Sequence, residues 1–200
     1  MSPDVSIAAE QLRRMRGMNA LYHRRFFSDV RYTTVVILGL FVAGVAIERA
    51  LFLLVPVVAL IGACQTAFDA SYLIFSRQYA TRLERFLNRE LGRDVLVAHR
   101  LEDVYLFPLD RPKIVTLAGG SSFTWFGFMT AFYTLIGAAS YLAGLWLGLS
   151  ALPEGLGRIA YWTLLLGLTL AALVVGGWWF VGGEGERRLR TVLDEAFGAE

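Results

Sequence analysis

A single carboxylate interrupts a long apolar stretch of this sequence. Asp69 is the only charged residue within 50–76. A charge inside hydrocarbon costs several kcal/mol, so such a residue is usually paired, faces a water-filled cavity or changes its protonation state. Four polar residues are spaced by four, three and four positions, which places them on one helix face: Gln65, Asp69, Tyr72 and Ser76. The spacing predicts a polar stripe that faces protein or water rather than lipid.

A basic residue near the start of the preceding apolar stretch is the predicted partner of Asp69. Only about three residues separate the two stretches, so we expect an antiparallel helical hairpin. If the turn is centred near residue 50, residues at equal depth have numbers that sum to about 100, and Arg31 lies level with Asp69. Thr34 and Thr66 then belong to the same polar layer. Two interpretations follow, namely an ion pair that fixes the hairpin register and a stripe that lines an ion or proton pathway.

Three residues near the middle of the chain are of types that bind metals. His99, Glu102 and Asp103 lie close together, but their spacing is loose and further His or Cys ligands are lacking. We therefore expect a solvated turn and no metal. The sequence also lacks a phosphate-binding glycine loop, a nucleophile elbow and a paired-cysteine motif. We expect neither an enzyme nor a cofactor.

The elements that must position these residues are predicted to be membrane-spanning helices. The chain is 56% hydrophobic and only 18% charged, which is too apolar for an ordinary soluble domain. A span needs roughly 18 to 20 apolar residues, and four uncharged runs approach or exceed this length: 32–47, 50–68, 114–153 and 159–183. The sequence predicts an all-α, integral membrane protein with amphipathic cytoplasmic helices and two transmembrane helical hairpins, 31–76 and 122–182.

The basic residues predict the orientation in the membrane. Of the 19 Lys and Arg residues, only Arg49 and Arg158 lie in the two predicted outer loops. The positive-inside rule then places both termini in the cytoplasm. We expect a multi-pass protein of the cell (plasma) membrane, the inner membrane of a bacterium. Its predicted cytoplasmic parts are an amphipathic N-terminal helix, a stalk with an interfacial loop, and a C-terminal helix: 1–30, 77–121 and 183–200.

The second span is predicted to continue beyond the membrane as an amphipathic stalk. No Gly or Pro interrupts 71–91, and Gly92 is a typical helix stop. The apolar face of the stalk needs a partner, which could be another copy, the start of the chain or the tail helix. Its basic face is predicted to contact anionic lipid headgroups or a protein partner, not nucleic acid: Arg82, Arg85 and Arg89. The following residues, 93–121, fit a small β-hairpin or an interfacial loop, because β-prone runs at 95–97 and 104–107 flank a polar turn.

Small residues in the third and fourth spans predict close helix contacts. Gly144 and Gly148 form a Gly-x-x-x-Gly pair, and Gly137 lies on the same side of the third span. Gly176 forms a similar small pair with Ala172 in the fourth span. Contacts within one chain and contacts between copies fit this spacing equally well.

Two functions follow from these features. In a homo-oligomeric ion channel, the polar stripe lines or supports the pore and the stalks form a cytoplasmic vestibule. In an accessory or scaffolding subunit of a larger membrane complex, the glycine faces and amphipathic helices are contact surfaces. The first half of the chain resembles SLATT-type bacterial membrane effectors in its amphipathic start, tight two-span hairpin and Arg- and Glu-bearing stalk at 77–91. The second pair of spans departs from that pattern. The resemblance implies a pore.

Overall fold

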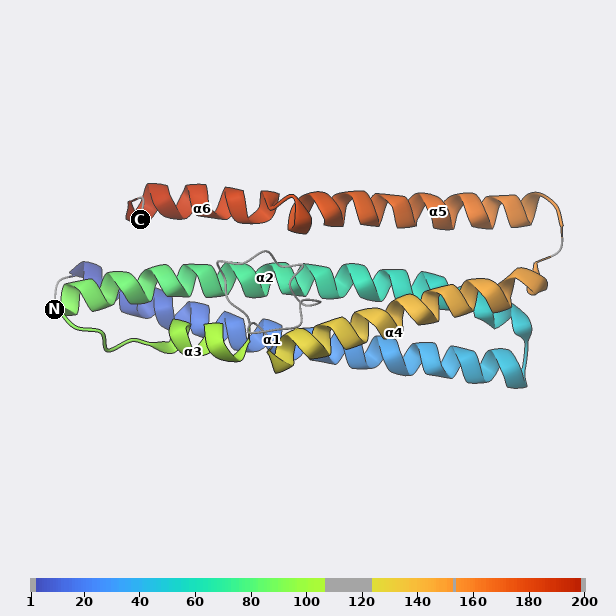
Figure 1. Cartoon of the computed structure of the whole chain (residues 1–200), viewed down its shortest axis with the longest axis horizontal. Coiled ribbons are helices and arrows are strands. Elements are labelled where there is room, and N and C mark those ends of the chain that lie inside the picture. The colour runs from blue at the N-terminus through green and yellow to red at the C-terminus, as the bar shows by residue number, and fades with distance from the viewer. Residues whose placement is uncertain (1–2, 107–123, 153, 199–200) are drawn as a thin grey trace. The chain divides into compact units, whose positions relative to one another are not determined.

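The computed structural model of this protein describes residues 3–106, 124–152 and 154–198 (Figure 1). These residues form helices and turns, with no strand among them. Four helical stretches are long and apolar enough to cross a membrane. The predicted all-helical chain with four such helices is confirmed for this part of the sequence. The elements in chain order are α1 (Pro3–Ala46), η1 (Arg49–Leu53), α2 (Leu54–Leu91), α3 (Ala98–Tyr105), α4 (Trp125–Gly148), η3 (Leu149–Ala151), α5 (Leu156–Gly176), η4 (Gly177–Val181) and α6 (Glu184–Phe197).

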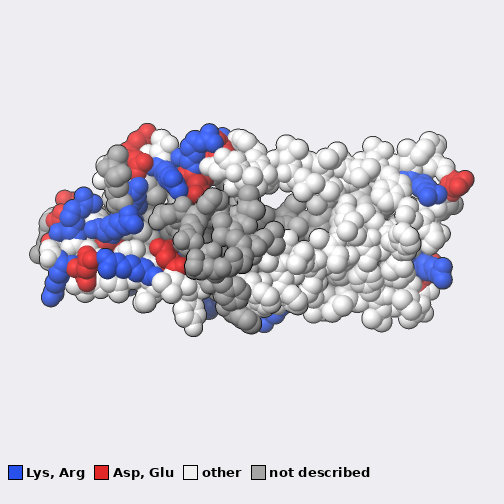
Figure 2. Space-filling model, in the orientation of Figure 1, with Lys and Arg blue, Asp and Glu red and all other residues white. Residues whose placement is uncertain are grey.

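The chain divides into two compact units, and the continuous helices α1 and α2 contribute to both. Unit 1 comprises Met1–Arg25, Asp69–Thr130 and Trp178–Glu200, and unit 2 comprises Phe26–Phe68 and Ala131–Gly177. The sequence of unit 2 contains only six charged residues: Asp29, Arg31, Glu48, Arg49, Glu154 and Arg158. Figure 2 shows charged side chains over the helices of unit 1 and a nearly uncharged surface over unit 2. Unit 2 therefore has the composition of a membrane-embedded bundle.

The core of unit 1 joins the start of α1 to the far half of α2. Apolar side chains recur at helical spacing on both helices and bury one another: Val5, Ala8 and Met15 of α1, and Ala80, Leu83 and Leu87 of α2. From α6, the Phe197 ring lies 6.1 Å from Tyr79 and 6.3 Å from Phe86. The start of the chain and the tail helix, two of the three predicted partners, therefore cover the apolar face of the stalk.

The N-terminal segment, for which an amphipathic helix over 1–30 is predicted, is helical from Pro3. It is the first part of the single helix α1, which continues to Ala46. No proline interrupts this helix after Pro3, and its apolar face matches the apolar face of α2. Burial against α2 therefore favours a helical conformation for the part of α1 that lies in unit 1.

The first hairpin of unit 2 turns through the short 3₁₀ helix η1. The Glu48 carboxylate accepts a hydrogen bond from the Ala50 backbone N–H at 3.4 Å. Further along the hairpin, Thr33 lies against Gly62, where an added Cβ would clash with the Thr33 side chain. The numbers of these two residues sum to 95, against an expected sum of about 100, give or take a turn. A 3₁₀ helix rises about 2.0 Å per residue against 1.5 Å in an α-helix, so η1 accounts for part of this shift.

Helices α4 and α5 complete unit 2 through small residues and tyrosine hydroxyls. Gly144 of α4 lies against Val55 at the start of α2. The Tyr141 hydroxyl lies 2.8 Å from the Thr169 hydroxyl of α5. The Tyr161 hydroxyl of α5 donates a hydrogen bond to the Leu53 carbonyl at 2.8 Å. These bonds satisfy polar groups that would be costly to leave unpaired in hydrocarbon.

Candidate functional site

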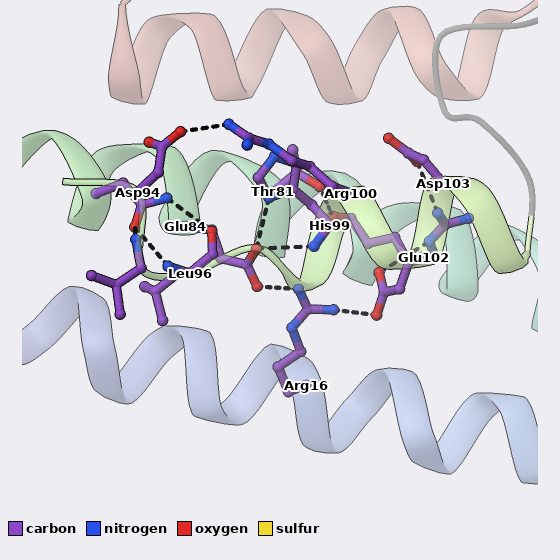
Figure 3. Close-up of polar contacts among 12 residues, drawn as sticks. Arg16, Thr81, Glu84, Asp94, Leu96, His99, Arg100, Glu102 and Asp103 are labelled. Carbon is purple, nitrogen blue, oxygen red and sulfur yellow. Dashed lines mark hydrogen bonds and ion pairs between the residues drawn. The ribbon is translucent and has the colours of Figure 1, made fainter.

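Six charged or ionisable side chains meet between α1, α2 and α3 in unit 1 (Figure 3). Two from α2 are almost completely buried, since the side chains of Arg77 and Glu84 are only 1% and 2% exposed. The others come from a turn of α1 and from one face of α3. We call these six residues the charged cluster: Arg16, Arg77, Glu84, His99, Glu102 and Asp103.

The guanidinium groups of the charged cluster bridge its carboxylates. Arg16 donates one hydrogen bond to Glu84 and another to Glu102. Arg77 Nε donates to Glu102 Oε2 at 3.2 Å, and its Nη2 donates to Asp103 Oδ1 at 3.1 Å. Helix α3 is therefore bound to α1 and to α2 by paired, charge-assisted hydrogen bonds, which are the stronger kind.

Glu84 also anchors the first turn of α3. Its Oε2 accepts hydrogen bonds from the His99 backbone N–H at 3.0 Å and from His99 Nδ1 at 2.8 Å. Nδ1 carries a hydrogen in this contact, because a carboxylate only accepts. Burial raises the pKa of the Glu84 carboxyl, but the bonds from Arg16 and His99 outweigh burial, so this pKa is lowered overall. Glu84 is thus held as a buried carboxylate.

The loop between α2 and α3 is organised by one amide side chain. Asn88 Oδ1 accepts from the backbone N–H groups of Val95 and Leu96, at 3.1 and 2.8 Å, and its Nδ2 donates to the Leu96 carbonyl at 2.8 Å. Helix α2 ends at Leu91, and Gly92 follows with a φ of 64°. The predicted end of the stalk at Gly92 is therefore confirmed. Glycine suits this position because it adopts positive φ without strain.

Two expectations for this region are wrong. The β-prone run at 104–107 begins inside helix α3, so no β-hairpin forms there, and Phe107 lies outside the described residues. The solvated turn expected around His99 is a helix whose histidine is only 7% exposed. Local propensity failed because the contacts of His99 and Glu102 lie 15 and 86 residues away in the sequence. No group of three His, Cys, Asp or Glu residues suited to a metal ion occurs among the described residues.

The arrangement of the charged cluster fits ion pairing. Each of its carboxylates accepts a hydrogen bond from a guanidinium group, as the bonds from Arg16 and Arg77 show. Burial lowers the pKa of Arg77, and the neighbouring Glu102 and Asp103 oppose this effect. A guanidinium remains charged at any physiological pH. The cluster therefore holds α3 against the stalk as a set of paired charges.

The predicted polar stripe on α2 is divided between buried and exposed positions. Asp69 and Ser76 are buried in unit 1, at 1% and 0% exposed. Tyr72 stacks on Tyr22 of α1, with ring centroids 4.5 Å apart and the planes 10° apart. Gln65, which belongs to unit 2, is exposed. Three members of the stripe thus face protein, while the fourth faces outward.

The residues predicted to accompany Asp69 make bonds within their own helices. Arg31 is exposed, and its Nε donates to the Phe27 carbonyl at 3.3 Å. The hydroxyls of Thr34 and Thr66 donate to backbone carbonyls one turn earlier, at 2.8 and 2.9 Å. Such bonds are usual for threonine inside a helix. Pairing between Arg31 and Asp69 joins the two units and stays a prediction.

The four predicted packing glycines fall into two groups. A Cβ added at Gly144 would lie 2.7 Å from the Val55 Cβ, and one at Gly148 would lie 2.9 Å from the Leu53 Cδ2. Added Cβ atoms at Gly137 and Gly176 would meet nothing within 4 Å. Gly144 and Gly148 therefore pack against η1 and the start of α2 within the chain, whereas Gly137 and Gly176 leave room for another helix.

The predicted basic face of the stalk is partly used inside the chain. Arg82 Nη2 donates to Asp194 Oδ1 of α6 at 2.6 Å, and the Arg82 side chain is 16% exposed. Arg82 therefore helps to dock the tail helix, which differs from its expected role in contacting lipid or a partner. Arg85 and Arg89 are exposed, and their contact with lipid or a protein partner stays a prediction.

One sequence signal could have located the charged cluster. Glu84 lies among Ala80, Leu83 and Leu87, so its carboxylate interrupts the apolar face of the stalk. A buried carboxylate requires a partner. The identity of its partners, Arg16 and His99, depends on tertiary contacts that spacing alone does not give.

The fold and the charged cluster together define an all-helical protein with four helices apolar enough to cross a membrane. Comparison with family models, curated proteins and solved structures finds no match.

Proposed function

We propose that this protein is a homo-oligomeric ion channel of the plasma membrane, with both termini in the cytoplasm. The observation that carries the proposal is the exposure of Gln65 on the apolar part of α2. A primary amide has donors and acceptors that are costly to leave unsatisfied in hydrocarbon. Water in a pore, or the same helix in another copy, would satisfy them. An assembly of several copies around an axis supplies both the pore water and the neighbouring helix.

Two further features support an assembly. Gly137 and Gly176 have open space where another helix would approach closely. In the most apolar stretch of each of the four candidate spans, at most 28% of the residues are buried inside the chain. Large uncovered helix surfaces in a membrane can contact lipid or other subunits. The open glycines favour subunits at those positions.

Unit 1 has the properties of a cytoplasmic collar around a pore entrance. The charged cluster and the bond from Arg82 to Asp194 hold four helices together: α1, α2, α3 and α6. Arg85 and Arg89 remain exposed on the stalk. Exposed basic residues at a vestibule raise the local concentration of anions and disfavour cations. The collar therefore contributes to selectivity in this proposal.

The alternative is an accessory or scaffolding subunit of a larger membrane complex. It is favoured by the mutual pairing of the buried charges within one chain, because a preformed unit 1 could bind another protein without rearrangement. In this alternative the surfaces of α4 and α5 bind membrane partners. Gln65 would then meet a polar residue of such a partner.

Conductance measurements with charge variants at Gln65 test the channel. The purified chain should conduct ions in planar bilayers, with Gln65→Glu shifting selectivity toward cations and Gln65→Lys shifting it toward anions. Val42→Leu is the matched control, because Val42 is an exposed apolar residue of α1 and its replacement adds no charge. A discrete multimer without conductance would overturn the channel. If neither Gln65 variant changes the ion selectivity or the conductance, α2 does not line the pore.

A further inference from the structure

Helix α3 has its polar and apolar sides reversed relative to an ordinary surface helix. Three polar residues of α3 bond to α1 and α2: His99, Glu102 and Asp103. Its large apolar residues are strongly exposed, with Leu101 at 66%, Val104 at 77% and Tyr105 at 79%. Each set follows helical spacing, so the two sets occupy opposite faces. The outward face is the apolar one.

The contacts of α3 define its direction along the stalk. Leu96 is bound by Asn88, His99 by Glu84, and Asp103 by Arg77. Later residues of this segment thus contact earlier residues of α2, so the segment runs antiparallel to α2. Its last turn, with Val104 and Tyr105, follows Asp103 and lies at about the level of Arg77.

Arg77 marks the edge of the apolar part of α2. It is the first charged residue after Asp69, and 78–91 contains further Arg and Glu residues. The end of α3 that lies level with Arg77 is therefore the end nearest to the hydrocarbon. Tyrosine is enriched at this depth, because its ring is apolar and its hydroxyl reaches the headgroups.

We propose that the last turn of α3 enters the headgroup layer of the cytoplasmic leaflet, with the outward side chains of Val104 and Tyr105 in contact with lipid. Leu101 lies about 6 Å further from the bilayer than Tyr105, because the four-residue step between these positions rises that far in an α-helix. The charged cluster keeps the polar side of α3 away from the lipid. The anchor depends on the chain crossing a membrane and does not depend on channel activity.

One arginine beside this face, Arg100, is placed where it could also meet lipid headgroups. Arg100 is 62% exposed beside the apolar face, and Asp94 binds its guanidinium at 2.6 Å. Basic residues close to a membrane are attracted to anionic headgroups. Aromatic and apolar side chains at the headgroup level are typical of the membrane–water interface. A lipid surface is therefore the occupant that matches both the chemistry and the depth of this face.

Nitroxide accessibility measures the depth of this face directly. The chain has one cysteine, so Cys64→Ala gives a background for single labels. Val104→Cys and Tyr105→Cys place labels on the proposed anchor, and Arg93→Cys places a control label at the exposed tip of the stalk. The full-length protein is reconstituted in nanodiscs of neutral and anionic phospholipid. Collisions with oxygen and with a water-soluble nickel complex are then compared.

The proposal predicts a several-fold higher oxygen-to-nickel collision ratio at positions 104 and 105 than at 93. A label at Leu101→Cys should give an intermediate ratio. Equal ratios at 104, 105 and 93 would show that water covers the face and would overturn the anchor. Labels at 104 and 105 shielded from both reagents would show that a protein surface, such as a second copy, covers it, which also overturns the anchor. None of these results depends on conductance, so a failed anchor and a failed channel are distinguishable.

Discussion

Replacing Glu84 with glutamine should release α3 from the stalk without disrupting the rest of unit 1. The Glu84 carboxylate accepts two hydrogen bonds from His99 and one from Arg16. Glutamine keeps one accepting oxygen and loses the charge. Both bonds from His99 are accepted by the same oxygen, Oε2, so in glutamine both lose their charge assistance. Hydrogen bonds to charged groups contribute about 1.5–3 kcal/mol and neutral ones about 0.5–1.5 kcal/mol, so this change costs α3 about 2–3 kcal/mol. Arg16 retains its bond to Glu102, which limits the damage to the core.

Amide hydrogen exchange in α3 measures this loss. At about 1.4 kcal/mol per factor of ten, exchange across α3 should accelerate roughly 30- to 140-fold in Glu84→Gln. Glu90→Gln is the matched control, because Glu90 is an exposed carboxylate later in the same helix. Exchange in the core helices α1 and α2 should change far less. Equal exchange of α3 in the two variants would refute the idea that Glu84 holds this helix.

Four further predictions follow from the described contacts. Gly144→Ala should lower the free energy of unfolding by about 1–3 kcal/mol, because the added Cβ clashes with Val55. Gly137→Ala, where an added Cβ meets nothing within 4 Å, should leave it unchanged or raise it by up to about 1 kcal/mol, and thermal unfolding of the two variants in detergent measures the difference. The pKa of the Glu84 carboxyl is lowered in the folded protein, so its stabilisation of α3 is complete above pH 4.5 and is lost as the pH falls through the folded-state pKa. In acid, hydrogen exchange of α3 in the wild type should therefore approach that of Glu84→Gln. A difference between the two proteins that does not change with pH would contradict this. A double-mutant cycle with Arg82→Gln and Asp194→Asn should give a coupling energy of roughly 0.5–1 kcal/mol in thermal unfolding, since the pair is partly exposed; additive effects would mean that the ion pair does not dock α6. Asp69→Asn and Arg31→Gln should each reduce the yield of assembled protein, and exchanging the two charges should partly restore it; no recovery in the exchanged variant would contradict the pair.

The helices could be predicted because their signals are local. Uncharged runs of sufficient length locate the apolar helices, and Gly92 marks the end of α2 because its φ of 64° suits glycine. The amphipathic pattern of the stalk predicted that its apolar face needs a partner, with the two chain ends among the candidates. The structure shows that they bury one another.

The charged cluster and the helix α3 could not be predicted from local signals. The short run around Val104 favours a strand by propensity, but the bonds of His99, Glu102 and Asp103 to distant residues favour a helix. This failure arises where tertiary contacts determine the backbone.

The mass of the purified assembly tests the central proposal most directly. Native mass spectrometry of the full chain, released from detergent micelles or nanodiscs, should show one discrete multimer of the 22.2 kDa subunit. Gln65→Leu, which removes the exposed amide of α2, should shift this distribution toward smaller species or alter its stoichiometry. A purified chain that is monomeric under conditions that preserve its helices would contradict the homo-oligomeric channel.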